Sequence, residues 1–310
     1  MFLQWDLNDK NLHQKYIELC EQEFETYFNE VVQSIAAFHR QDLKVLTIAG
    51  PTSSGKTTIA LKLSRELSKL GITAKIISMD NFFKDTDKME TKEDGTPNFE
   101  ALGAVDVELL IKCINEAIHD NQTQMPAFDF IRGRRADELK EFKLGKNEIM
   151  IVEGIHGLNP RITDNFPGQN LKSIYVTIGE KVFIPNDIIF SKRDVRILRR
   201  MIRDYKYRGA SPEFTFMLWE TVRESESIYI FPYEPNADIR INSLHRYELS
   251  VMRSQAEELL FGIEKDSPYY DKARELINKL SYVPYIDESL VPDSSLVREF
   301  IGDSIYYEDI

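Results

Sequence analysis

The stretch IAGPTSSGKTTIA at residues 48–60 decides the fold. Its segment from Gly50 to Thr57 matches the phosphate-binding pattern G-x-x-x-x-G-K-[ST] at every fixed position. An apolar run, LKVLTIAG at 43–50, precedes the motif, and a helical pattern at 56–71 follows it. This order of strand, loop and helix is the context that the motif requires, so we predict a loop that wraps a nucleotide phosphate.

The residue types in this loop indicate its ligands. Backbone N–H groups and the start of the helix attract anionic oxygens, and the glycines let the backbone approach them closely. Lys56 would neutralise charge on the β- and γ-phosphates, and the Thr57 hydroxyl would ligate Mg²⁺. We therefore expect ATP and Mg²⁺ as cofactors. The expected ATP-binding residues of the loop are Gly50, Thr52, Ser53, Ser54, Gly55, Lys56, Thr57 and Thr58.

The composition argues against several other classes of protein. The 310 residues carry a formal net charge of −12, which repels a phosphate backbone and speaks against a nucleic-acid partner. The two cysteines, Cys20 and Cys113, lie far apart and in no metal-like spacing, as is typical of a reducing compartment. The N-terminus lacks the basic region of a secretory signal, and no long apolar run exists, so we expect a cytoplasmic protein without a membrane partner.

Strands alternate with helices along the chain, which predicts a parallel sheet with helices on both faces. We therefore expect the α/β fold of a P-loop NTPase, with an added helical lid and an N-terminal helix. The expected strands lie at 43–50, 73–80, 147–154, 171–178 and 237–242, and the expected helices at 13–39, 56–71, 107–119, 193–209, 248–263 and 269–281. The expected domains are an amphipathic helical extension at 1–42, a P-loop domain at 43–262 with a lid around 192–212, and a C-terminal helix and tail at 263–310 packed on that domain.

Two of the predicted strands end in an acidic residue, KIISMD in Asp80 and IMIVEG in Glu153. Ligands of parallel sheets bind at the carboxyl ends of the strands, so both carboxylates should lie beside the phosphate loop. One of them could hold Mg²⁺, and the other could accept a proton from a substrate hydroxyl as the γ-phosphoryl group leaves ATP. The competing interpretation is a strand-end acid that caps a neighbouring helix.

The helical stretch at 192–208 is strongly basic although the whole chain is acidic. Its arginines recur at helical spacing on one face, namely Arg196, Arg199, Arg200 and Arg203. We interpret the stretch as a mobile lid that brings positive charge to the migrating phosphoryl group and excludes water. The alternative is a solvated face in which Asp194 and Asp204 pair with some of the cations.

Several ordered motifs together resemble the uridine kinase and phosphoribulokinase family of P-loop kinases. They run from about 44 to 242 and read GPTSSGKTT, ISMDNFF, NFEALGAVDVELL, PAFDFIRGRR, IVEGIHGLN, RRMIRDYKYRG and ADIRIN. The chain looks similar in particular to the kinase portion of longer bacterial uridine kinases, in which domains like those of threonyl-tRNA synthetase precede the kinase. That similarity extends through SYVPYIDESLVPDSSLVREFIG at 281–302, and of the preceding domains we expect only the leading helix here.

The resemblance implies a role for each matching position. Asp80 corresponds to the catalytic base that activates a nucleoside 5′-hydroxyl, Glu153 to the acid near Mg²⁺, and Glu100 to the position that binds ribose hydroxyls. The lid residues Arg200, Arg203 and Arg208 correspond to arginines that contact phosphates and substrate. The implied catalytic residues are Asp80, Lys56 and Arg203. The lid adds Arg203 and Arg208 to the ATP site. The substrate site is Asp80, Glu100, Phe128, Asp129, Arg134 and Arg200, and the metal site is Thr57 and Glu153.

Departures from the family pattern concentrate in the base pocket. Phe128 and Gly133 stand where uridine kinases usually have the Tyr and His that help to hold the pyrimidine. Ala210 and Leu218 stand where the family has an Arg and a Gln. A site that loses its hydrogen-bonding groups loses discrimination, so we expect intact phosphate machinery and an altered base pocket. The basic residues of the turn at 132–135 would suit a more anionic substrate, or they form an exposed basic turn.

The leading hypothesis is an ATP- and Mg²⁺-dependent kinase for a hydroxyl of a small metabolite, with the 5′-hydroxyl of a nucleoside as first choice. A sugar phosphate or another polar acceptor is the alternative within the same chemistry. From another class, the chain could be a nucleotide-binding regulator whose N-terminal helix contacts a partner. The retention of both strand-end acids speaks against a regulator, because an ATP sensor does not need Asp80. A homo-oligomer is compatible with the sequence.

Overall fold

The computed structural model describes residues 9–92, 95–166, 170–179, 181–184 and 188–307. A five-stranded parallel sheet forms its centre, in the order β11-β8-β1-β7-β2. Its strands are β1 (Val45–Ala49), β2 (Thr73–Ser78), β7 (Glu148–Glu153), β8 (Leu171–Thr177) and β11 (Ile239–Asn242). The predicted α/β fold and all five predicted strands are therefore confirmed.

Both faces of this sheet are buried by helices. The main helices are α1 (Lys10–His39), α2 (Lys56–Lys69), α3 (Val107–His119), α5 (Lys192–Arg208), α6 (Pro212–Tyr229), α7 (Glu248–Phe261) and α8 (Tyr270–Leu280), and two short ones are α4 (Pro160–Thr163) and α9 (Arg298–Ile301). Alternate residues of β1 enter different core clusters: Leu46 and Ile48 pack with α1, α2, α5 and α7, whereas Val45 packs with α3 and α4. This alternation is what a two-sided buried strand requires.

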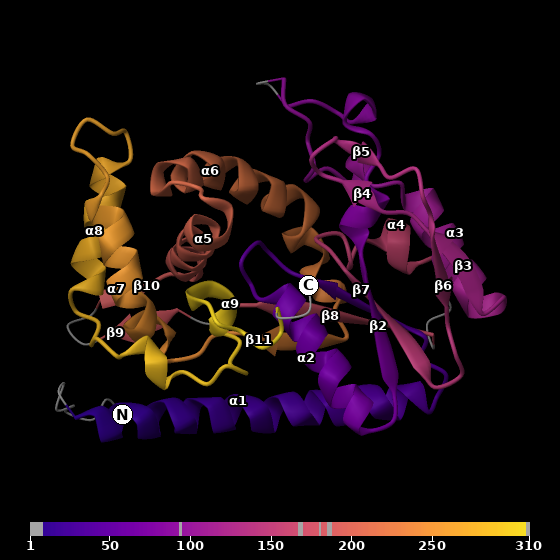
Figure 1. Cartoon of the computed structure of the whole chain (residues 1–310), viewed down its shortest axis with the longest axis horizontal. Coiled ribbons are helices and arrows are strands. Elements are labelled where there is room, and N and C mark those ends of the chain that lie inside the picture. Colours follow the sequence, from indigo (N-terminus) through magenta and orange to yellow (C-terminus); the bar gives the residue numbers. More distant parts are fainter. Residues whose placement is uncertain (1–8, 93–94, 167–169, 180, 185–187, 308–310) are drawn as a thin grey trace.

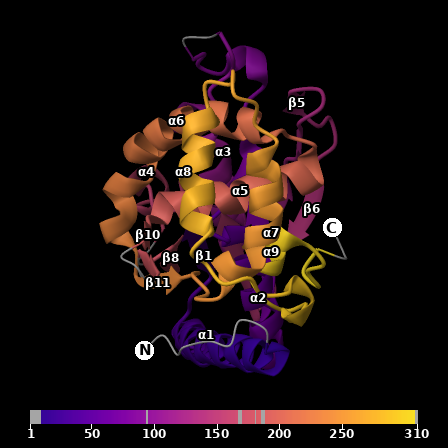
Figure 2. The same ribbon diagram turned by 90° about the vertical axis from the view of Figure 1, so that its left-hand side faces the viewer.

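Helix α1 runs along one side of the molecule and is part of the main core (Figure 1). Asp9 caps its first turn, and its apolar side chains recur at helical spacing, including the fully buried Phe28 and Ile35. At the other end of the chain, α7 and α8 pack together, and α7 also contacts α5 (Figure 2). The N-terminal extension, the P-loop region and the C-terminal helices thus share one continuous core.

Three small antiparallel pairs complete the described strands, and the sequence pattern did not predict them. They are β3 (Gln122–Met125) with β6 (Lys140–Lys143), β4 (Phe128–Asp129) with β5 (Arg134–Arg135), and β9 (Val182–Ile184) with β10 (Ile188–Phe190). Short 3₁₀ turns lie at η1 (Met79–Phe82), η2 (Thr86–Lys88), η3 (Leu102–Ala104), η4 (Phe231–Asn236) and η5 (Glu288–Leu290). Among the described residues, no helix has the length and apolarity needed to cross a membrane.

Candidate active site

The phosphate loop lies between the end of β1 and the start of α2, where two glycines are required by geometry. A Cβ atom on Gly50 would lie 2.1 Å from the carbonyl oxygen of Val176 on the neighbouring strand, so no side chain fits there. Gly55 caps α2 with φ +91°, a left-handed conformation that favours glycine. The loop backbone can therefore fold close to a ligand, as the motif predicts.

Two hydroxyl groups of the loop lack hydrogen-bond partners among the described residues, and a lysine lies beside them. The hydroxyls of Ser53 and Ser54 are buried and have no hydrogen-bond partner among the described residues. Lys56 Nζ donates to the carbonyl oxygens of Gly50 at 2.8 Å and Pro51 at 3.2 Å, and burial lowers the pKa of this ammonium group. Buried polar groups normally find partners, so unpaired hydroxyls beside a lysine form a cradle that fits a phosphate-bearing ligand.

Asp80 and Glu153 meet at the rim beside this loop. Glu153 is the last residue of β7, and its strand neighbours are Ile48 of β1 and Ser78 of β2. Asp80 lies two residues after Ser78, in η1, and is reached by solvent. Both acids therefore lie at the carboxyl edge of the sheet next to the loop, as the sequence pattern predicts.

The carboxyl group of Asp80 is perturbed by this setting. The protein around it removes part of its hydration, and this loss together with the nearby Glu153 carboxylate raises the pKa of Asp80 to about 6, although Lys56 opposes the shift. The pKa of Glu100 is also raised, chiefly by burial, while Lys56 and Arg200 oppose the shift. A carboxylate with a raised pKa beside a phosphate loop is well suited to accept a proton near neutral pH.

The donor set at this rim also fits a divalent cation. Thr57 supplies a hydroxyl, and Glu153 a carboxylate. Magnesium prefers oxygen ligands and is usually held by one or two protein groups together with substrate phosphates and water. Among the described residues, no cluster of three or more His, Cys, Asp or Glu forms a closed metal site. The arrangement suits a cation that arrives with its nucleotide.

The basic helix α5 divides into two parts, and the first part is buried against the loop. Arg196 Nε donates to the Thr52 carbonyl oxygen at 2.9 Å, and the Arg196 side chain pairs with Glu226. Arg199 has no exposed surface and donates to the Ser53 carbonyl oxygen at 3.3 Å. These two arginines support the back of the phosphate loop.

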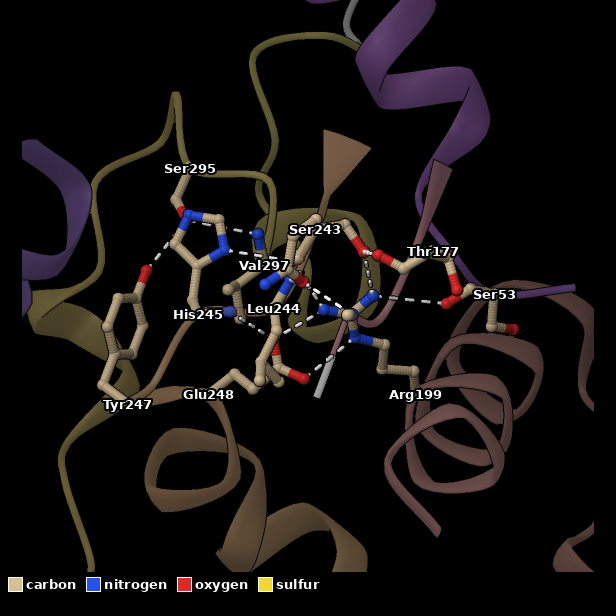
Figure 3. A network of polar contacts seen from close by, with 12 residues as sticks. Ser53, Thr177, Arg199, Ser243, Leu244, His245, Tyr247, Glu248, Ser295 and Val297 are labelled. Carbon is tan, nitrogen blue, oxygen red and sulfur yellow. Dashed lines mark hydrogen bonds and ion pairs between the residues drawn. The ribbon is translucent and has the colours of Figure 1, made fainter. Parts of the chain in front are cut away.

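Arg199 stands at the centre of a wider polar network (Figure 3). It forms a two-point contact with Glu248, at 3.0 Å from Nε and 2.6 Å from Nη2, and it also bonds Ser243. The network continues to Tyr247, whose hydroxyl bonds Glu21 of α1. A buried arginine of this kind depends on its partners, because an unpaired charge is costly in the interior.

The second part of α5 presents its arginines around one carboxylate. Asp204 is buried and pairs with Arg200 at 3.2 Å, Arg203 at 2.7 Å and Arg208 at 3.4 Å. Arg203 also lies 4.0 Å from Glu299. One carboxylate shared by three guanidinium groups leaves most of their donors for other ligands.

The predicted base pocket is an aromatic wall. Phe128 is buried and packs edge-to-face with Phe83 at 5.6 Å and Phe130 at 5.1 Å between ring centroids. Asp129 accepts hydrogen bonds from the N–H groups of Ile131 and Arg132, so it orders the turn between β4 and β5. Among the implied substrate residues, Asp129 is thus engaged within its own hairpin.

The cations of this hairpin have local partners. Arg134 is half-exposed and lies 3.9 Å from Asp137. Arg135 donates to the carbonyl oxygens of Phe82 and Phe83 and pairs with Asp106 at 2.9 Å, so it holds η1 in place. Arg135 therefore acts on the fold near Asp80, and it does not add a free cation to the acceptor side.

Two groups beside the loop escaped the sequence analysis. Glu226 of α6 is buried and accepts a hydrogen bond from the Thr52 N–H at 2.8 Å. Glu299 of α9 accepts a hydrogen bond from the Thr58 hydroxyl, and the Tyr307 hydroxyl lies 3.0 Å from that Thr58 oxygen. No local motif marks these residues. The apolar residues of α5 lie on one face and its arginines on the other, so no signal in the sequence indicated that the first arginines are buried.

Known proteins resemble this chain over much of its length. A model of the phosphoribulokinase / uridine kinase family matches residues 45–250. A uridine kinase of Clostridium tetani is 30% identical over 198 residues, which cover 64% of this chain and 85% of the relative. A uridine kinase of Macrococcus caseolyticus is 26% identical, with 70% of this chain and 97% of the relative covered. The solved structure of a possible uridine kinase from Bacillus stearothermophilus is 20% identical, with a TM-score of 0.47, and covers 71% of this chain and 99% of its own.

Proposed function

The chain belongs to the phosphoribulokinase and uridine kinase family of P-loop kinases, and on that premise we propose that it transfers the γ-phosphoryl group of ATP to a hydroxyl of a small uncharged metabolite. The leading acceptor is a nucleoside, through its 5′-hydroxyl. The observation that carries this proposal is the meeting of Asp80 and Glu153 beside the phosphate loop. A nucleotide-binding protein without phosphoryl transfer has no use for a base at that position.

Each residue has a defined task in this reaction. Asp80 accepts the proton of the acceptor hydroxyl as its oxygen attacks the γ-phosphorus. Lys56 and Arg203 stabilise negative charge on the transferring group and on the leaving ADP. Thr57 and Glu153 would hold Mg²⁺, which when bound neutralises charge on the β- and γ-phosphates. Arg196 and Arg199 keep the loop carbonyls in place, which keeps the loop N–H groups directed at the phosphates.

The charges on the acceptor side support an uncharged acceptor. Asp80, Glu153 and Glu100 all act on this region, while Arg135 is already paired with Asp106. A second phosphate on the acceptor would meet these carboxylates and lose affinity through like-charge repulsion. Glu100 and Arg200 lie close enough to influence each other, and they offer an acceptor and a donor for vicinal hydroxyls.

A non-nucleoside acceptor is the second candidate. Phe128 packs within an aromatic cluster and brings no hydroxyl to the position from which a pyrimidine would be read. Gly133 has φ +64° in the β4–β5 turn and likewise brings no hydrogen-bonding side chain. An aromatic wall without these groups gives the base little to bond, so a compact polyol is compatible with the same catalytic residues.

The test is a panel of acceptors with purified protein, Mg²⁺ and ATP. We expect ADP release with uridine or cytidine, and at least tenfold lower kcat/KM with ribose 5-phosphate than with the best uncharged acceptor. Preference for the sugar phosphate would overturn the uncharged acceptor, and preference for an uncharged polyol over the nucleosides would favour the second candidate. ADP release that does not depend on any acceptor would contradict phosphoryl transfer to a hydroxyl.

A further inference from the structure

A cavity of about 480 Å³ lies between the phosphate loop, the end of α5 and the C-terminal segment, which we define as residues 296–307. It is lined by Thr57, Arg203, Tyr207, Arg208, Glu299 and Tyr307. Its size falls in the range of small-molecule sites. Glu299 and Tyr307 lie beyond residue 250, where the match to the family model ends. The cavity is therefore built in part by a segment to which the comparisons assign no role.

The C-terminal segment is fixed to the phosphate loop helix. Leu296 packs directly on Gly55, since a Cβ atom there would lie 2.8 Å from the Leu296 side chain. Glu299 and Tyr307 both contact the hydroxyl of Thr58 in the first turn of α2. The segment also lies beside α2 in the overall view (Figure 1). These contacts hold it against the first turn of α2, directly after the phosphate loop.

A second set of contacts fixes the segment to α5. Lys206 Nζ donates to the Ile301 carbonyl oxygen at 2.7 Å, and the Arg199 guanidinium lies over the Phe300 ring at 4.6 Å from its centroid. Arg203 and Tyr207 therefore face the cavity from a helix that is braced against its opposite wall. The cavity is a built feature of the described structure.

The direction of the nucleotide follows from the sheet. The γ-phosphate must face Asp80, which lies on the β7–β2 side of β1. The remainder of ATP then extends from the loop away from β2, past Thr57. Thr57 and the cationic pair Arg203 and Arg208 line the cavity, so the α- and β-phosphates would pass between them.

The other groups of the cavity suit a nucleoside better than a further anion. Tyr207 is 57% exposed and Tyr307 is 37% exposed, so aromatic surface is available to a ligand. Nucleobases stack on aromatic side chains irrespective of their hydrogen-bonding pattern. The Glu299 carboxylate repels phosphate but accepts hydrogen bonds from ribose hydroxyls or a base amino group.

We propose that this cavity binds the base and ribose of ATP, with Tyr207 and Tyr307 as the base-binding residues, so that the C-terminal segment completes the nucleotide site. The proposal rests on the proposed function in placing ATP at the phosphate loop with its γ-phosphate toward Asp80. It concerns the nucleoside end of ATP, which the acceptor reaction does not touch.

The test compares two probes in equilibrium binding without any acceptor, ATP and inorganic tripolyphosphate, each with Mg²⁺. In Tyr207→Ala and in Tyr307→Ala, loss of stacking should weaken ATP binding by roughly 5- to 100-fold. Tripolyphosphate has no base, so its Kd should stay within about twofold of the wild-type value. Tyr205→Ala is the matched control, because Tyr205 lies on the same helix, is 54% exposed and does not line the cavity.

Each other outcome overturns the proposal. Equal weakening of both probes would mean that the tyrosines only brace the phosphate loop. Tighter ATP binding in Tyr307→Ala would mean that the segment obstructs the site, and an unchanged ATP Kd in both variants would place the base elsewhere. Tyr207 is largely exposed, so its variant should fold, and its unfolding midpoint checks this. Since no acceptor is present, failure of the proposed kinase reaction leaves this measurement unaffected.

Discussion

Helix α5 carries two groups of arginines that the sequence does not distinguish but the structure does. Arg196 and Arg199 are 4% and 0% exposed and pair with buried glutamates of α6 and α7. Arg200, Arg203 and Arg208 share Asp204, and Arg203 and Arg208 also line the cavity beside the phosphate loop. Members of both groups fall on one helical face by spacing.

The difference lies in what each guanidinium contacts. The first group bonds carbonyl oxygens of Thr52 and Ser53, so its hydrogen bonds are consumed by the protein. The second group keeps donors available, since one carboxylate serves three side chains. A cationic stripe on a kinase helix can thus serve stability at one end and chemistry at the other. The first half of the predicted lid at 192–212 is anchored in the core. A lid motion could therefore involve only the second half.

The largest effect on stability should come from Arg199→Met. Removal of this partner leaves Glu248 buried without its counter-ion, which should lower the free energy of unfolding by about 3–5 kcal/mol. Chemical denaturation of the purified variant measures it. The double variant with Glu248→Leu should lose less than the sum of the two single changes, because no charge then remains unpaired. Strict additivity would contradict the assignment of a buried pair.

The opposite pattern is expected for Arg203→Gln. This side chain lines the cavity beside the phosphate loop, where we propose that the nucleotide binds, so its loss should lower kcat by about 10²–10³-fold, while the free energy of unfolding changes by no more than about 1 kcal/mol. Steady-state kinetics and denaturation on the same sample separate the two. If stability fell as far as in Arg199→Met and kcat did not, the two groups of arginines would have been assigned the wrong way round.

Acid should act on the chemistry through Asp80. Its pKa is raised to about 6, and the base works only when deprotonated, so kcat/KM for the acceptor should fall about tenfold per pH unit below that value. A pH profile from 5 to 8 is the measurement. Titration of ATP itself is common to all variants, so the residual rate of Asp80→Asn serves as the control. If kcat/KM fell with acid in the same way in wild type and in Asp80→Asn, Asp80 would not be the group that titrates.

The smallest effect is expected at the exposed end of α5. The Arg208 side chain is 63% exposed, and solvent screens its charge. In Arg208→Ala we therefore expect the KM for ATP to rise only about two- to fivefold, with kcat and stability nearly unchanged. A large fall in kcat would show that the second group acts as a closed unit around the nucleotide in spite of its exposure.

Local sequence patterns were sufficient to predict the central sheet and the phosphate loop. Four of the five strands carry short apolar runs, β11 alternates apolar and polar residues, and the loop motif between β1 and α2 depends on residues adjacent in sequence. The positions of Asp80 and Glu153 followed from a rule about parallel sheets, so long-range reasoning was needed only once. This is why the fold and the two acids at the rim could be predicted together.

The long-range hydrogen bonds that hold the phosphate loop could not be predicted in the same way. Thr52 bonds Glu226 across 174 residues, and Thr58 bonds Glu299 across 241 residues. Neither glutamate belongs to a pattern of its own, because each is defined by the tertiary fold. The difference between the two groups of arginines on α5 could not be predicted for the same reason. It depends on the positions of Glu226, Glu248 and Asp204 in the tertiary structure.

The central claim is that Asp80 acts as the base of a phosphoryl transfer at this loop. The most direct measurement compares wild type and Asp80→Asn in transfer of labelled γ-phosphoryl from ATP to the best acceptor, with ATP binding measured separately. We predict that kcat falls by about 10²–10⁴-fold while the Kd for ATP stays within about twofold. An intact rate of transfer in Asp80→Asn would contradict the account.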